Sequence, residues 1–265
     1  MIEHRWQLWL LGWAAAALLL GGLYLLQRRT RDATAVDVGW AGSLVLIAAL
    51  AAAFGPGELE HRLLILAVAG LENLRIASLV RGRLGKGEDT RYQELRRRWR
   101  ERGREQLTFA IFYQAQALVA AVLAIPFVLI AFNRGDGLAP LEWVGAALWL
   151  VAAPLEALAD RQLKSFKADE ANKGRTMREG LWRYSRHPNY FFQWLTWVAY
   201  ALIALAAPWG WIGLAAPAFI LYLILFITGV KPAEEQALRS RGDDFRRYQH
   251  ETSAFIPWFP RSSTV

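Results

Sequence analysis

The sequence predicts an all-α, polytopic integral membrane protein with seven transmembrane helices and a cytoplasmic C-terminus. Hydrophobic residues make up 55% of the 265 positions, and several apolar runs reach the roughly 18 to 20 residues that cross a bilayer. Charged residues are gathered in blocks between these runs, and the 13 Trp lie mostly near their ends, as in an interfacial aromatic belt. We therefore expect a single membrane domain over residues 1–265.

Seven apolar segments fit as spans. We expect helices over residues 6–26, 38–54, 62–80, 107–132, 141–159, 190–207 and 209–230. The first is too long for an ordinary signal-peptide core, and no Ala-x-Ala cleavage signal follows it. The last two are joined only by Ala207-Pro208-Trp209-Gly210, so they are expected to form an antiparallel helical hairpin.

The distribution of Lys and Arg supports this number of spans. The segments after the first, third and fifth spans and the C-terminal tail carry 3, 10, 8 and 6 of the 31 basic residues. With seven spans, all four segments lie on one side of the membrane, and the positive-inside rule makes that side cytoplasmic.

Composition and motif spacing exclude several classes of function. The chain has no Cys, so disulfides, thiolate metal sites and Cys nucleophiles are excluded. Its 4 His include no pair at metal-ligand spacing, and we expect no metal site. Basic cytoplasmic loops explain the net charge of +8, so no nucleic-acid partner is expected. The spacing of the glycines fits neither a P-loop nor a Rossmann motif, and there is no Gly-x-Ser-x-Gly nucleophile elbow.

Ionisable residues inside predicted spans are the first candidates for chemistry, because each costs at least about 2.5 kcal/mol at the bilayer centre unless it is paired or hydrated. Glu72 and Arg75 lie three residues apart on one face of the third span and can form an ion pair. The pair either neutralises itself or supplies an acid and an anion-binding cation. Asp37, at the start of the second span, either caps that helix or forms the polar floor of an apolar pocket.

The long loop after the third span has two parts of different composition. Its arginine run, residues 96–104, is interpreted as an anchor for anionic lipid headgroups. Asp89, Arg91 and Tyr92 precede the run. Because an acid adds nothing to a lipid anchor, these three residues are candidates for ligand binding.

A polar stripe follows the fifth span. Glu156, Asp160, Lys164 and Lys167 recur at intervals of four, four and three, so they share one face of a helix that leaves the membrane. The stripe is either a self-paired interfacial helix or the wall of a ligand site, in which acids meet hydroxyls or amides and lysines meet phosphates.

The entry to the sixth span joins basic, hydrogen-bonding residues to a long apolar run. Arg186 can meet an anionic ligand, and Pro188 fits the first turn of a helix. Asn189 and Gln193 are four residues apart and share one helical face. This arrangement suggests polar chemistry held at a membrane interface.

Together these motifs resemble a superfamily of membrane enzymes that includes steroid 5-alpha reductases, sterol reductases and isoprenylcysteine carboxyl methyltransferases. The C-terminal elements of the resemblance are Arg186-His-Pro-Asn-Tyr190, Glu234-Glu235, Tyr248 and Ile256-Pro257. Two more elements are similar to the bacterial branch that resembles steroid 5-alpha reductases, namely Glu156-x3-Asp160-x-Gln162-x3-Phe166-Lys167 and Gly87-x-Asp89-x-Arg91-Tyr92.

The resemblance implies an NADPH-dependent oxidoreductase that reduces the C=C bond of an enone lipid, such as the delta-4 bond of a 3-oxosteroid, to the 5-alpha product. NADPH would enter from the cytoplasm, and the lipid or steroid substrate from the bilayer of the bacterial inner membrane. A monomer is expected, with most of the cofactor-binding motif in residues 150–260. The implied cofactor-binding residues are Arg75, Asp89, Arg91, Tyr92, Asp160, Lys164, Lys167, Arg175, Tyr184, Arg186, Asn189, Tyr190, Glu234 and Glu235.

Asp37 and Glu72 are the candidate catalytic residues. They match the positions where animal steroid reductases carry a Gln-Glu pair on the second span and a Tyr on the third. One of them would hydrogen-bond the ketone while hydride reaches the beta carbon. Two alternatives stay open. One is an S-adenosylmethionine-dependent methyltransferase, which needs fewer phosphate-binding cations; the other is a lipid transporter, which inverted repeats would have favoured.

Overall fold

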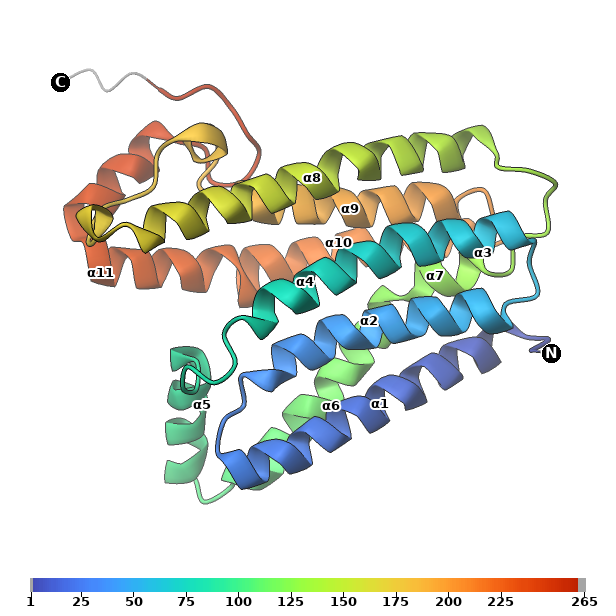
Figure 1. The fold of residues 1–265 in the computed structure, drawn as a ribbon, viewed down its shortest axis with the longest axis horizontal. Helices are drawn as coiled ribbons and strands as arrows, with labels where there is room; N and C mark the ends of the chain where they lie inside the picture. Colours follow the sequence, from blue (N-terminus) through green and yellow to red (C-terminus); the bar gives the residue numbers. More distant parts are fainter. Residues whose placement is uncertain (1, 262–265) are drawn as a thin grey trace. The chain divides into compact units, whose positions relative to one another are not determined.

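The computed structural model describes residues 2–261, which form helices and connecting loops without a β-strand (Figure 1). In chain order the elements are α1 Arg5–Thr30, α2 Ala35–Phe54, α3 Leu59–Ile65, η1 Leu66–Gly70, α4 Leu71–Arg81, α5 Thr90–Glu101, α6 Glu105–Leu123, α7 Ile125–Ile130, α8 Pro140–Ala168, η2 Glu170–Asn172, η3 Gly180–Arg183, α9 Pro188–Ala204, η4 Gly210–Leu214, α10 Ala215–Tyr222, η5 Leu223–Thr228 and α11 Val230–Glu251. The all-α prediction is confirmed for this part of the chain.

Within residues 2–261, six helical segments are long and apolar enough to cross a membrane, which indicates an integral membrane protein. They are Arg5–Thr30, Ala35–Phe54, Leu59–Arg81, Glu105–Leu123, Pro140–Ala168 and Gly210–Glu251. The predicted span 190–207 corresponds to α9, which has only 17 residues. The number of seven spans and the cytoplasmic C-terminus stay predictions.

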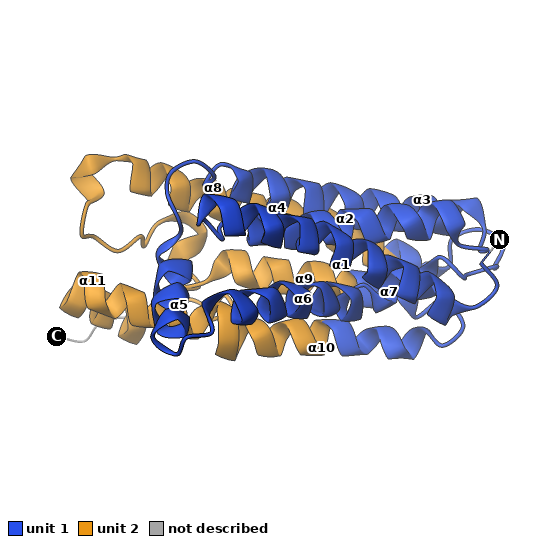
Figure 2. Cartoon of the chain, turned by 90° about the horizontal axis from the view of Figure 1, so that it is seen from below, with its two compact units in different colours: residues 1–143, 200–216 blue, residues 144–199, 217–265 orange. Residues whose placement is uncertain are grey.

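The chain folds into two compact units (Figure 2). Unit 1 comprises residues 1–143 and 200–216, and unit 2 comprises residues 144–199 and 217–265. Unit 1 therefore holds α1 to α7, and unit 2 holds most of α8 and α9 together with α11. The single membrane domain expected from the sequence stays a prediction.

Small side chains let the helices of unit 1 approach closely. On α1 a buried row recurs every fourth residue, at Leu8, Gly12, Ala16 and Leu20, and α1 packs against α2 and α6. A Cβ added at Gly12 would lie 3.1 Å from a methyl carbon of Ile47 on α2. The absent side chain therefore allows the tight packing that is typical of membrane helices.

The fourth predicted span is interrupted. Residues 107–132 were expected to form one helix, but α6 ends at Leu123 and the short helix α7 begins at Ile125. Pro126 lies in the first turn of α7, where its missing N–H is tolerated. Within a continuous helix, its ring would clash with the preceding turn and remove a hydrogen bond.

The helices of unit 2 bring the two main sequence motifs together. The predicted fifth span continues as α8 through Ala168, so the whole stripe from Glu156 to Lys167 lies on one helix. The indole N–H of Trp194 on α9 donates to the carbonyl of Pro217 at 3.1 Å. This contact joins α9 to the start of the returning helix, as the predicted hairpin requires.

Candidate functional site

The best-defined candidate site in unit 2 is a pair of side chains from α8 and α9. Asn189, at the second position of α9, donates from Nδ2 to Oδ1 of Asp160 on α8 at 3.0 Å. A carboxylate only accepts hydrogen bonds, so Asp160 fixes the orientation of the Asn189 amide. Asn189 Oδ1 is buried and accepts no hydrogen bond from residues 2–261. Leaving such an acceptor unmatched costs about 1–3 kcal/mol, so this oxygen is a binding point for a ligand donor.

A second cluster in unit 2 is centred on Glu234. Arg186 Nε donates to Glu234 Oε1 at 2.7 Å, and His187 Nε2 lies 3.2 Å from the same oxygen. Gln249 donates to the other carboxylate oxygen at 2.8 Å. The structure thus pairs two predicted cofactor residues, Arg186 and Glu234, with each other. A phosphate approaching Arg186 would compete with Glu234 for the guanidinium.

The loop between α8 and α9 is held by Arg178, Thr176 and Asp244, which the sequence motifs did not identify, and by Tyr248, which belongs to the family resemblance. Arg178 donates to the carboxylate of Asp244 at 2.8 Å, and the backbone N–H of Thr176 donates to the same side chain at 2.8 Å. The hydroxyl of Tyr248 donates to the carbonyls of Trp182 and Ser185. The mixed charges of the tail were the available signal, but they did not identify the partners because each pair lies more than 60 residues apart.

The second half of this loop, at η3, packs against α8. The Leu181 N–H donates to Gln162 Oε1 at 3.1 Å, and the indole of Trp182 donates to the carbonyl of Ala159 at 3.0 Å. Gly180 has φ 57°, and a Cβ there would lie 2.4 Å from Gln162 Nε2. Only glycine fits this position without displacing Gln162.

The remaining predicted cofactor residues of unit 2 lie around these clusters. Tyr190 stacks on His187 with ring centroids 5.6 Å apart. Tyr184 is partly exposed and meets Phe259 edge to face. Four residues have exposed side chains, from which they can reach a soluble anion or hydroxyl group: Lys164, Lys167, Arg175 and Glu235.

An open cavity of about 460 Å³ lies beside α8 in unit 2. Its lining includes Arg161, Ser165, Phe166 and Asn172. None of the predicted cofactor residues lines this cavity, because it uses another face of α8 than the Asp160 stripe. We therefore assign the candidate site to the Asp160–Asn189 pair rather than to the cavity.

In unit 1 the structure brings Asp37 together with the long loop. The hydroxyl of Tyr92 donates to Asp37 Oδ1 at 2.5 Å, and Arg91 Nη2 donates to Asp37 Oδ2 at 2.9 Å. Arg91 also bonds Asp89, which caps the N-terminus of α5. Burial and the neighbouring carboxylate of Asp37 raise the pKa of the Tyr92 phenol, so it stays a proton donor at neutral pH.

Hydrogen bonds also set the charge state of Asp89. Burial opposes ionisation of this side chain, but the bonds from Arg91 outweigh it and hold the Asp89 pKa below its ordinary value. Asp89 is therefore a carboxylate at neutral pH, and it orients Arg91 toward Asp37.

The second candidate acid is held separately from the first. Glu72 is 3% exposed and accepts a 2.7 Å bond from Arg75, the i,i+3 pair predicted from the sequence. The five-residue π-helical segment η1 precedes α4 and ends two residues before Glu72. Such π-turns are frequent at functional sites, because they shift the side chains that follow around the helix axis.

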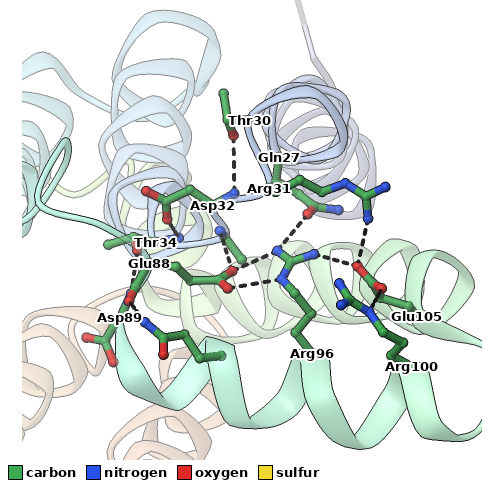
Figure 3. Close-up of polar contacts among 12 residues, drawn as sticks. Gln27, Thr30, Arg31, Asp32, Thr34, Glu88, Asp89, Arg96, Arg100 and Glu105 are labelled. Atoms are coloured by element: carbon green, nitrogen blue, oxygen red, sulfur yellow. Dashed lines mark hydrogen bonds and ion pairs between the residues drawn. The ribbon is translucent and has the colours of Figure 1, made fainter.

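The interpretation of residues 96–104 as a lipid anchor is wrong for Arg96. This side chain is 7% exposed and lies between two acids (Figure 3). It donates to Glu88 at 2.7 Å, to Glu105 at 2.6 Å and to the side-chain oxygen of Gln27 at 3.1 Å. Arg96 therefore ties α5 to α1 and α6, while Arg97 and other members of the run stay exposed.

The fold and these clusters define a polytopic helical membrane protein with polar side chains gathered near the ends of its helices. A family model described as "Protein of unknown function (DUF1295)" matches residues 23–252, and the chain belongs to this steroid 5-alpha reductase-like family. No curated protein and no solved structure matches the chain.

Proposed function

We propose that the protein is an NADPH-dependent reductase of an enone lipid, with the delta-4 bond of a 3-oxosteroid as the model substrate. The family supports this class of reaction, and the observation that carries it is the Asp160–Asn189 pair. A buried, oriented amide oxygen without a protein donor is suited to a ligand that carries N–H or O–H groups. The nicotinamide carboxamide and the ribose hydroxyls of NADPH are such donors.

The side chains of unit 2 fit the parts of this cofactor. Asn189 and Asp160 would take the amide or ribose groups, and the exposed cations Lys164, Lys167 and Arg175 would meet the phosphates. Glu234 and Glu235 would accept bonds from the ribose or adenine end. When bound, NADPH supplies the hydride for the beta carbon of the enone.

The protein's share of the chemistry is to bind the ketone and supply the proton. An ionised carboxylate only accepts hydrogen bonds, so Asp37 or Glu72 donates to a ketone only when it carries a proton. Tyr92 is a protonated donor bonded to Asp37, which makes the Asp37 cluster a route for proton delivery. Charge that develops on the ketone oxygen would be stabilised by that donor, and the alpha carbon would then be protonated from solvent or a relay.

One assay tests the proposal. Purified protein in detergent is incubated with NADPH and progesterone, and the saturated 5-alpha product is sought by mass spectrometry together with NADPH oxidation. Asp37→Asn and Glu72→Gln are assayed in parallel, and the variant that loses product while binding NADPH normally identifies the acid. Neither NADPH oxidation nor a melting shift with NADPH, combined with a melting shift with S-adenosylmethionine, would replace this proposal with the methyltransferase.

A further inference from the structure

The C-terminal segment after α11 is held by its backbone against the entry to α9. Arg186 N–H donates to the carbonyl of Ser253 at 2.8 Å, and Trp258 N–H donates to the carbonyl of Tyr184 at 2.8 Å. The hydroxyl of Ser185 donates to the carbonyl of Phe255 at 2.8 Å. The segment is therefore fixed in place by hydrogen bonds that do not depend on burying its side chains.

Its largest side chains point outward. Ile256 is 60% exposed, Trp258 is 70% exposed and Phe259 is 75% exposed, although they lie outside every predicted span. Three such residues in four positions form a contiguous apolar tip. A tip of this kind marks a contact surface, because isolated exposed apolar residues are ordinary but contiguous ones are not.

The position of the tip along the chain indicates what covers it. Phe255 packs against Phe191 and Trp194 in the first turns of α9, with centroids 5.6 and 6.0 Å apart. The tip thus begins at the level where the apolar part of α9 begins. Exposed Arg183 and Arg261 flank it, so apolar rings are bordered by cations.

We infer that residues 256–259, the aromatic tip, insert into the boundary between headgroups and acyl chains of the bilayer that the protein spans. Trp and Phe beside Arg suit this boundary, since the rings enter the acyl region while the cations meet anionic headgroups. None of residues 256–259 is among the proposed cofactor or catalytic residues, so the inference stands independently of the proposed function.

Insertion would also steady the Glu234 cluster. Arg186 Nη1 donates to the carbonyls of Gln249 at 3.0 Å and Thr252 at 2.6 Å, and the aromatic tip follows these residues by only a few positions. The backbone that carries the tip also accepts these hydrogen bonds from Arg186. A lipid contact at the tip therefore restricts the motion of the Arg186 side chain.

The absence of Cys makes the test direct, because a single introduced Cys can be spin-labelled without background. Trp258→Cys is labelled in lipid nanodiscs, and its accessibility to oxygen and to a water-soluble nickel chelate is measured by electron paramagnetic resonance. Leu18→Cys, on the exposed face of the first span, is the lipid reference, and Asp243→Cys, whose side chain on α11 is 87% exposed, is the aqueous reference. We expect the ratio of oxygen accessibility to nickel accessibility at position 258 to lie closer to the ratio at position 18 than to the ratio at the aqueous reference.

Two results would overturn the inference. An oxygen-to-nickel accessibility ratio at 258 equal to that at 243 would place the tip in water, and low accessibility to both reagents would mean that a protein surface covers it. Phe259→Cys serves as a second label site, and both variants must keep the parent melting temperature. As an independent readout, hydrogen exchange of the Arg186 and Trp258 amides should be slower in nanodiscs than in detergent. Equal rates would rule out that insertion of the tip restricts Arg186.

Discussion

Asp37 in unit 1 and Asp160 in unit 2 are each held by a side chain from a distant part of the sequence, but their partners are satisfied to different degrees. Tyr92 and Arg91 direct their donors at Asp37, whose two oxygens both accept bonds. Asn189 uses its amide nitrogen on Asp160 and keeps its buried oxygen without a donor from residues 2–261. The first cluster is complete by itself, whereas the second has an acceptor left for a ligand.

Polar clusters that are satisfied within the protein are structural, whereas a buried group without a protein partner is available to a ligand. The Arg96 network is also complete, since Glu88, Glu105 and Gln27 all accept from it (Figure 3). The Arg96 network should govern stability and should not depend on the cofactor. The Asn189 oxygen should govern cofactor affinity with little effect on stability.

The largest effect is expected when Arg96 is replaced by Met. This change leaves two acids near each other without their shared cation, which costs roughly 3–5 kcal/mol for a buried pair. The melting temperature should fall strongly, and by the same amount with and without NADPH. Arg97→Met is the matched control, because Arg97 is exposed and a surface pair contributes about 0–1 kcal/mol. Equal melting temperatures for the two variants would contradict the structural role of the network.

The next prediction concerns Tyr92→Phe, which removes the donor to Asp37. If this cluster delivers the proton, kcat should fall about 100-fold, the lower end of what general acids contribute, with NADPH affinity unchanged. Tyr113→Phe is the control, since Tyr113 is a buried phenol of unit 1 bonded to the carbonyl of Ala33. An unchanged kcat for Tyr92→Phe would leave Glu72 as the acid and make the Asp37 cluster purely structural.

Local sequence patterns predict the contacts and helices that depend on residues close together in the chain. The Glu72–Arg75 pair and the Glu156–Lys167 stripe follow from helical periodicity, and the apolar runs located the starts of the long helices to within three residues. The bond from Tyr92 to Asp37 joins residues 55 positions apart, and periodicity carries no information about such contacts. Burial of Arg96 was missed for the same reason, since its neighbours in sequence are exposed arginines.

The position of the helix break between α6 and α7 could not be predicted from the sequence pattern either. Residues 107–132 form a mostly apolar segment that is long enough to predict one span. Only Pro126 marks the break. A proline inside an apolar run is an ambiguous signal, because Pro154 is accommodated within the continuous helix α8. The packing around each proline decides the outcome, and the sequence alone does not contain it.

A smaller effect is expected for Asn189→Ala. Loss of one neutral hydrogen bond is worth about 0.5–1.5 kcal/mol, so NADPH affinity should weaken roughly 2- to 12-fold. Isothermal titration with NADPH measures this change, and the melting temperature without cofactor should alter little. Gln193→Ala, four residues further along α9, is the control and should bind NADPH normally. Unchanged NADPH affinity in Asn189→Ala would mean that the Asn189 oxygen is not a binding point for the cofactor.

The smallest effect concerns the pH dependence contributed by Asp89. Its pKa is lower in the folded protein than the ordinary value of 3.8, so the carboxylate stabilises the fold at every pH above that value. This contribution, expected to be below about 1 kcal/mol, is lost as pH falls from about 3.8 through the folded-state pKa. The melting-temperature difference between the parent and Asp89→Asn should therefore be constant from neutral pH down to about 4 and shrink in more acidic buffer. A difference that persists unchanged into strong acid would mean that Asp89 acts through its neutral hydrogen bonds, and the charge it directs at Arg91 would then have no part in holding the Asp37 cluster.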